Sequence, residues 1–260
     1  MPRAFTRAVS PRLADCQLTH QPRVLIDAAK AAQQHAAYEQ ALADAGFEIV
    51  RLPELADDPD AVFVEDTAVI LDGHAIITRP GAASRIGEID STTAGLSPHL
   101  ELHRIESGHL DGGDVLRIGK RLYVGRSTRT NVEGIIDLSA LVTPLGFEVH
   151  AARLRGCLHL KTGASFAGLD ASGTPILLYD ANSVDPTAFG KDVQPVAVSF
   201  DEPAAANCIR AGEHIIMPAG NPRTAALLRD RGLTVIEVDV SELQKAEAGV
   251  TCMSLIDDRP

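Results

Sequence analysis

The stretch Leu110-Asp111-Gly112-Gly113-Asp114 leads directly into an apolar run of β type, and four other short polar clusters in the chain do the same. Those clusters are Phe63-Val64-Glu65-Asp66, Leu158-His159-Leu160-Lys161, Ala206-Asn207-Cys208 and Val250-Thr251-Cys252. If Asp66, Asp111, His159, Asn207 and Cys252 are taken as markers, successive markers are 45, 48, 48 and 45 residues apart. A period of this length predicts a repeat architecture, in which each repeat is one supersecondary unit.

The residues between the markers follow a common course, which we interpret as strand, strand, helix, strand. The second strand is predicted over 75–79, 121–126 and 214–218, the helix over 81–95, 128–145 and 222–231, and the returning strand over 46–50, 146–150 and 232–236. Asn221-Pro222 has the form of an N-cap followed by proline at the first helical position. The N-terminal repeat is longer, with a strand near 4–9 and a helix over 24–45. The fourth repeat is rich in Pro and Asp over 172–198, and little helix is predicted there.

A ring of such repeats would bring the five markers together on its axis. A thiol, an imidazole and several carboxylates in one cavity suit nucleophilic attack on a cationic carbon. The competing interpretation is a doubly wound α/β domain with polar strand ends. Neither Gly-x-Gly-x-x-Gly nor a P-loop stands between strand and helix to support it, and Gly112-Gly113 is interpreted as a tight bend.

Length and composition indicate one enzyme-sized domain spanning residues 1–260. The chain is 45% hydrophobic, enough for a sizeable core, and no linker-like segment divides it. The N-terminus lacks the apolar region of a secretory signal, and no apolar run is long enough to cross a bilayer, so a cytoplasmic location is expected. The cysteines form no CxxC pair, so neither disulfides nor a metal site is predicted, and Cys16, Cys157 and Cys208 are expected to be small buried hydrophobes.

A formal net charge of −11 argues against nucleic acid and anionic membranes as partners, because both require basic surfaces. The acidic balance is compatible with a small cationic substrate, but a simple contribution to solubility is the favoured interpretation. The sequence leaves a homodimer open.

Cys252 differs from the other cysteines because it shares its position in the repeat with His159 and Asp111. A thiol becomes a nucleophile when neighbouring positive charge stabilises its thiolate. His159 or a bound cation could supply that charge, and Asp111 is the candidate carboxylate that orients the imidazole.

The five clusters, together with Arg79-Pro80-Gly81, Arg85 and Arg129-Thr130-Asn131, resemble the dimethylarginine dimethylaminohydrolase family of the guanidino-group-modifying (pentein) superfamily. The resemblance runs essentially from end to end. It implies an α/β fold, a five-bladed propeller of ββαβ repeats around a central active-site cavity. It also implies hydrolysis of N-ω-methylated arginine to citrulline and a methylamine through a covalent S-alkylthiouronium, without a cofactor.

Carried onto this sequence, the resemblance makes Cys252 the nucleophile, His159 the general acid/base and Asp111 its partner. The substrate-binding residues that it implies are Leu18 on a flexible lid, Asp60 and Ala246 for the α-amino group, Glu65 and Asp66 for the guanidinium, Arg85 and Arg129 for the carboxylate, and Glu247 in the loop beside the substrate. Three alternatives stay open: an arginine deiminase or amidinotransferase, an inactive propeller that binds a ligand, and a Cys/His peptidase.

Overall fold

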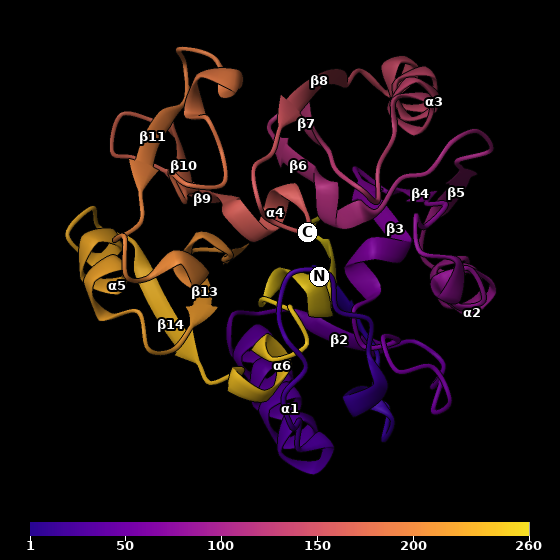
Figure 1. The fold of residues 1–260 in the computed structure, drawn as a ribbon. Helices are drawn as coiled ribbons and strands as arrows, with labels where there is room; N and C mark the ends of the chain where they lie inside the picture. Colours follow the sequence, from indigo (N-terminus) through magenta and orange to yellow (C-terminus); the bar gives the residue numbers. More distant parts are fainter. Residues whose placement is uncertain (260) are drawn as a thin grey trace.

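The computed structural model describes residues 1–259, which form five three-stranded sheets arranged in a ring (Figure 1). Each sheet is called a blade here. In every blade the middle strand pairs antiparallel with one neighbour and parallel with the other. A parallel pair needs a crossover connection, and an α-helix provides it in four of the five blades.

The elements of the five blades have the following bounds. Blade 1 contains β15 (Leu255–Asp257), β1 (Arg3–Thr6), α1 (Ala28–Asp44) and β2 (Glu48–Arg51). Blade 2 contains β3 (Ala68–Leu71), β4 (His74–Ile77), α2 (Glu88–Leu96) and β5 (Glu101–Arg104). Blade 3 contains β6 (Val115–Ile118), β7 (Arg121–Arg126), α3 (Val132–Val142) and β8 (Glu148–Arg153). Blade 4 contains β9 (Ala164–Leu169), β10 (Pro175–Tyr179) and β11 (Gln194–Ala197), and blade 5 contains β12 (Ile209–Ala211), β13 (His214–Pro218), α5 (Pro222–Arg229) and β14 (Thr234–Val238).

The two ends of the chain close the ring. The last strand, β15, pairs antiparallel with β1, so that blade 1 is built from both ends of the sequence, and both termini lie near the centre of the ring in Figure 1. β15 thus supplies the first strand of blade 1, and all five blades have three strands. The predicted five-bladed α/β propeller of ββαβ repeats is confirmed.

Two helices begin later than predicted because of local capping. The helix predicted over 24–45 begins at Ala28, because the side chain of Asp27 accepts a hydrogen bond from the Lys30 N–H. The helix predicted over 128–145 begins after Asn131, which caps the N–H of Gly134. The strand predicted near 4–9 covers only Arg3–Thr6, and the stretch 81–95 divides into a 3-10 turn and α2.

The fourth blade lacks an α-helix between its second and third strands, as predicted. A short 3-10 turn over Pro186–Phe189 stands in its place. Phe189 from this turn is fully buried in the apolar cluster between blades 3 and 4, which also contains Tyr123 and Leu177. The blade therefore keeps its packing against its neighbour with a shorter connection.

A helical turn precedes the first strand of every blade, and the polar clusters of the sequence fall on these turns. They are Val64–Thr67, Gly112–Asp114, α4 (Leu160–Gly163), Pro203–Ala206 and Thr251–Met253. The first strands of neighbouring blades contact one another, β6 with β9, β9 with β12, and β15 with β3. The turns therefore meet around the axis of the ring. In the part of the chain that the structure describes, no helix combines the length and apolar character needed to cross a membrane.

Candidate active site

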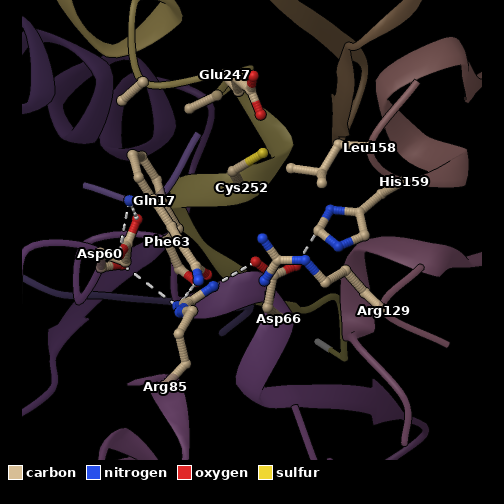
Figure 2. A pocket seen from close by; sticks show the side chains of 12 residues that line it. Gln17, Asp60, Phe63, Asp66, Arg85, Arg129, Leu158, His159, Glu247 and Cys252 are labelled. Atoms are coloured by element: carbon tan, nitrogen blue, oxygen red, sulfur yellow. Dashed lines mark hydrogen bonds and ion pairs between the residues drawn. The ribbon is translucent and has the colours of Figure 1, made fainter. Parts of the chain in front are cut away.

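A pocket is lined by residues that come from several blades (Figure 2). Eight of the predicted site residues line it: Asp60, Asp66, Arg85, Arg129, His159, Ala246, Glu247 and Cys252. Asp111 is fully buried directly behind His159. Leu18 and Glu65 are not among the lining residues. The structure thus brings most of the predicted residues together, while their catalytic roles stay predictions.

The imidazole of His159 is held between two carboxylates. Its Nε2 lies 3.0 Å from Oδ2 of Asp111, and its Nδ1 lies 3.6 Å from Oδ1 of Asp66. Asp111 is fixed in turn, because its Oδ1 accepts a hydrogen bond of 2.8 Å from the N–H of Gly81. Since Nε2 is engaged by the buried Asp111, Nδ1 is the nitrogen that remains for chemistry in the pocket.

The electrostatic environment favours the protonated imidazole. Burial of His159 opposes protonation, but the charges of Asp66, Asp114 and Asp111 and the hydrogen bond to Asp111 outweigh it and raise its pKa to about 9. Asp114 does not contact the ring. Its Oδ1 accepts the N–H of Leu160 at 2.9 Å and so positions the turn that carries His159.

Cys252 is a half-buried residue on the turn before β15. Burial of its sulfur and the charges of Glu65 and Asp66 raise its pKa to about 12. One donor acts in the opposite direction, because the N–H of Gly249 points at Sγ from 3.4 Å. The free protein therefore holds a thiol next to a protonated imidazole, and a cation in the pocket would offset the two carboxylate charges.

Asp66 and Arg85 form a buried ion pair beside the pocket. The Arg85 guanidinium also donates from Nε and Nη2 to the two carboxylate oxygens of Glu88, at 2.8 and 2.7 Å, and from Nη2 to the carbonyl oxygen of Phe63. Arg85 thus already has protein partners for most of its N–H groups. The pair holds the Asp66 carboxylate in one orientation. Burial alone would raise the pKa of Asp66, but the charges of His159 and Arg85 outweigh it, so the pKa is lowered.

Glu65 is buried and does not line the pocket. Its carboxylate pairs with Nζ of Lys161 at 2.6 Å and accepts a hydrogen bond of 2.8 Å from Thr251 Oγ1. Asn207 joins the same network by donating to Thr251 Oγ1 and to the carbonyl oxygen of Lys161. These contacts link four blades on the axis, so Glu65 and Asn207 support the turns that carry Cys252 and His159.

The loop that follows residue 16 covers the pocket, and two predicted substrate-binding residues hold it. Both oxygens of Asp60 accept the N–H of Gln17 at 3.2 Å. The carboxylate of Glu247 accepts three successive backbone N–H groups, from residues 19, 20 and 21, at 2.9, 2.5 and 2.5 Å. Leu18 packs on the core beneath this loop. Arg129 donates one hydrogen bond of 3.3 Å to Thr19 and forms no ion pair within residues 1–259.

Four lining residues were missed by the sequence analysis: Gln17, Phe63, Leu158 and Ala248. Phe63 and Leu158 stand in the polar clusters that mark the repeat, so the period could have indicated them. Gly113 was interpreted as part of a tight bend, but a Cβ there would lie 2.7 Å from both His159 Nδ1 and Asp66 Oδ1. The close approach of these two side chains requires glycine.

No family model matches the chain. A curated relative from Pseudomonas aeruginosa, N(G),N(G)-dimethylarginine dimethylaminohydrolase, is 41% identical over 233 residues, which cover 88% of this chain and 89% of the relative. The chain belongs to the dimethylarginine dimethylaminohydrolase family. A second family member, from Streptomyces coelicolor, is 38% identical over 97% of this chain and 96% of its own length.

Solved structures of dimethylarginine dimethylaminohydrolase match the whole fold. A Cys-to-Ser variant of the Pseudomonas aeruginosa enzyme complexed with citrulline superposes with a TM-score of 0.89, at 36% identity over 98% of each chain. An adduct of dimethylarginine dimethylaminohydrolase with S-methyl-L-thiocitrulline gives a TM-score of 0.87 at 36% identity, over 98% of this chain and all of that one. The N-terminal domain of the arginine dihydrolase ArgZ has the same fold, with a TM-score of 0.85 at 19% identity over 100% of this chain and 98% of that one.

Proposed function

We propose that this chain hydrolyses N-ω-methylated arginine to citrulline and a methylamine, with Cys252 as the nucleophile. The observation that carries the proposal is the composition of the pocket, in which a thiol and an imidazole lie with the buried carboxylates of Asp60 and Asp66. Membership of the dimethylarginine dimethylaminohydrolase family supports the same reaction.

The substrate guanidinium adds a positive charge next to Asp66 and the sulfur of Cys252. Asp66 accepts its N–H groups, and the ion pair with Arg85 holds the carboxylate in place for them. The bound cation lies beside the sulfur, offsets the charges of Asp66 and Glu65, and lowers the pKa of Cys252, so that the thiolate forms in the complex. The protonated His159 then stands ready as an acid.

The reaction proceeds in two halves. The Cys252 thiolate attacks the guanidinium carbon, the carbon–nitrogen bond to the methylated nitrogen breaks, and His159 Nδ1 gives its proton to the departing amine. This leaves an S-alkylthiouronium on Cys252 and a neutral imidazole whose Nε2–H is still donated to Asp111. Nδ1 next takes a proton from water, and the hydroxide adds to the same carbon. The carbon–sulfur bond then breaks as the remaining hydroxyl proton leaves to solvent, which releases neutral citrulline and the thiolate.

The amino-acid end of the substrate is assigned to the groups at the other side of the pocket. Arg129 has no ion-pair partner among residues 1–259, so its guanidinium suits the substrate carboxylate better than that of Arg85 does. Asp60 and the backbone at Ala246 are assigned to the α-amino group. Asp60 accepts the N–H of Gln17 in the free protein, and the α-ammonium group of the substrate would compete for this carboxylate.

The test is citrulline release from asymmetric dimethylarginine, monomethylarginine, arginine and agmatine in parallel, with Cys252→Ser as the blank. Turnover of the methylated arginines alone, absent from the blank, is the expected result. Turnover of arginine would instead indicate a deiminase that uses the same residues. Binding of methylarginine without turnover by the unmodified chain would identify an inactive ligand-binding propeller.

A further inference from the structure

A second cluster of metal-ligating side chains lies outside the pocket, on blade 2. His74 starts β4, and Glu101 and His103 belong to β5. His74 Nδ1 is 3.0 Å from His103 Nε2, and the two oxygens of Glu101 lie 3.6 and 3.8 Å from these nitrogens. One ligand atom from each of the three residues lies within 4.8 Å of the others.

The pairing of the strands produces this arrangement. β4 and β5 run parallel with His74 opposite Glu101 and Ile76 opposite His103, so all three polar side chains emerge on the same face of the blade. The two imidazoles keep about a quarter of their side-chain surface exposed, and Glu101 keeps about two thirds. An ion can therefore reach the cluster from solvent.

We propose that His74, Glu101 and His103 bind a divalent transition-metal ion, with water completing its coordination. Two imidazole nitrogens and one carboxylate oxygen form a donor set that suits Zn²⁺ and its neighbours in the first transition row, whereas Ca²⁺ and Mg²⁺ prefer oxygen ligands alone. Three protein ligands leave positions for water. A bound ion would join β4 to β5 at the start of both strands and stabilise the blade.

The neighbouring blade provides an internal comparison. Blade 3 repeats the Glu-x-His pattern, with Glu148 and His150 on β8 and 3.5 Å between their oxygen and nitrogen atoms. The position equivalent to His74 is occupied by Arg121, which is paired with Asp192 and cannot ligate a metal. Blade 3 therefore lacks one of the three proposed ligands. Its fold also shows that a blade accommodates arginine at the position of His74.

The experiment measures binding of Zn²⁺ alone by isothermal titration calorimetry, in a Cys252→Ser background that removes the pocket thiol. The pocket also holds Asp66, Asp111 and His159 close together, and it is identical in every variant, so differences between variants report on blade 2. Three substitutions remove ligands, His74→Arg, His103→Gln and Glu101→Gln, and His150→Gln is the matched control. The proposal predicts that each of the three removes one equivalent of Zn²⁺ or weakens its binding at least about tenfold.

The control variant should bind Zn²⁺ like the parent. The thermal unfolding midpoint should rise with Zn²⁺ in the parent and the control, and not in His74→Arg. Glu101→Gln changes an exposed side chain, so it tests the site even if a histidine variant fails to fold. Equal stoichiometry and affinity in all five proteins would overturn the proposal and leave a simple hydrogen bond between the two imidazoles.

Discussion

Replacement of Asp111 by asparagine keeps the shape of the side chain and removes its charge. The amide oxygen can still accept the N–H of Gly81, as Oδ1 of Asp111 does. The amide NH₂ then faces Nε2 of His159, which must accept a hydrogen bond instead of donating one. The neutral imidazole would carry its proton on Nδ1, where it cannot take a proton from water.

The expected loss can be worked from this contact. A buried hydrogen bond to a charged group contributes about 1.5–3 kcal/mol, and about 1.36 kcal/mol corresponds to a tenfold change in rate, so kcat should fall roughly 10- to 150-fold. The wrong tautomer adds to this loss, which reaches about 10⁴ in a comparable triad. Loss of the Asp111 charge also lowers the pKa of His159 from about 9 toward its ordinary value.

The assay is citrulline release across the pH range 6–10. His159 acts as an acid in the first half-reaction, so the rate should fall at high pH as the imidazole loses its proton, and in Asp111→Asn that fall should begin at lower pH. Asp180→Asn is the matched control, because Asp180 is also buried and hydrogen-bonded, to Asn182 and Ser183, but does not contact His159. An Asp111→Asn variant with more than a tenth of the parent rate and an unshifted pH profile would refute the reasoning.

Three further substitutions test other contacts. Gly113→Ala should reduce kcat/KM at least about tenfold, because its Cβ would lie 2.7 Å from both His159 Nδ1 and Asp66 Oδ1, whereas Gly87→Ala, whose Cβ meets no atom within 4 Å, should leave kcat/KM unchanged. Glu247→Gln leaves fewer acceptors for the three backbone N–H groups of the covering loop, so proteolysis within 17–23 should accelerate and KM should rise; an unchanged KM would contradict this role. Lys161→Met leaves the buried Glu65 carboxylate without its ion-pair partner and should lower the free energy of unfolding, measured with urea, by about 3–5 kcal/mol. Lower pH, or the additional substitution Glu65→Gln, should partly restore it.

The period of the polar clusters predicted the ring because each repeat of the sequence folds into one blade. Every cluster lies on the turn before the first strand of a blade, and the first strands contact one another around the axis. Equivalent positions in the repeat therefore become neighbours in space, and this explains why Asp111 and His159, 48 residues apart, meet at 3.0 Å. The strands predicted over 121–126 and 214–218 coincide with β7 and β13 for the same reason.

The ion-pair partners that a side chain finds in another blade could not be predicted from the sequence of a single repeat. Glu65 and Asp66 are adjacent in the sequence, and Asp66 was expected to hold the guanidinium with Glu65 beside it, yet the two carboxylates have different partners. Glu65 pairs with Lys161 from another blade, and Asp66 pairs with Arg85. Arg85 was expected to be available for a substrate carboxylate, but Glu88, one turn further along, occupies it. Each of these outcomes depends on distances between side chains that the spacing of residues leaves undetermined.

On the proposed mechanism, the distribution of charge in the pocket keeps the Cys252 thiol protonated in the absence of substrate. Asp66 serves three purposes at once: it pairs with Arg85, raises the pKa of His159 and raises the pKa of Cys252. A pocket with fewer carboxylates would form the thiolate more easily, but it would bind a guanidinium less well and would protonate His159 less. Asp66, one of the two carboxylates that raise the pKa of Cys252, is therefore also the one proposed to bind the cation that would lower it. Nucleophile formation is coupled to substrate charge, so a neutral isostere of the guanidinium should bind weakly and leave Cys252 protonated.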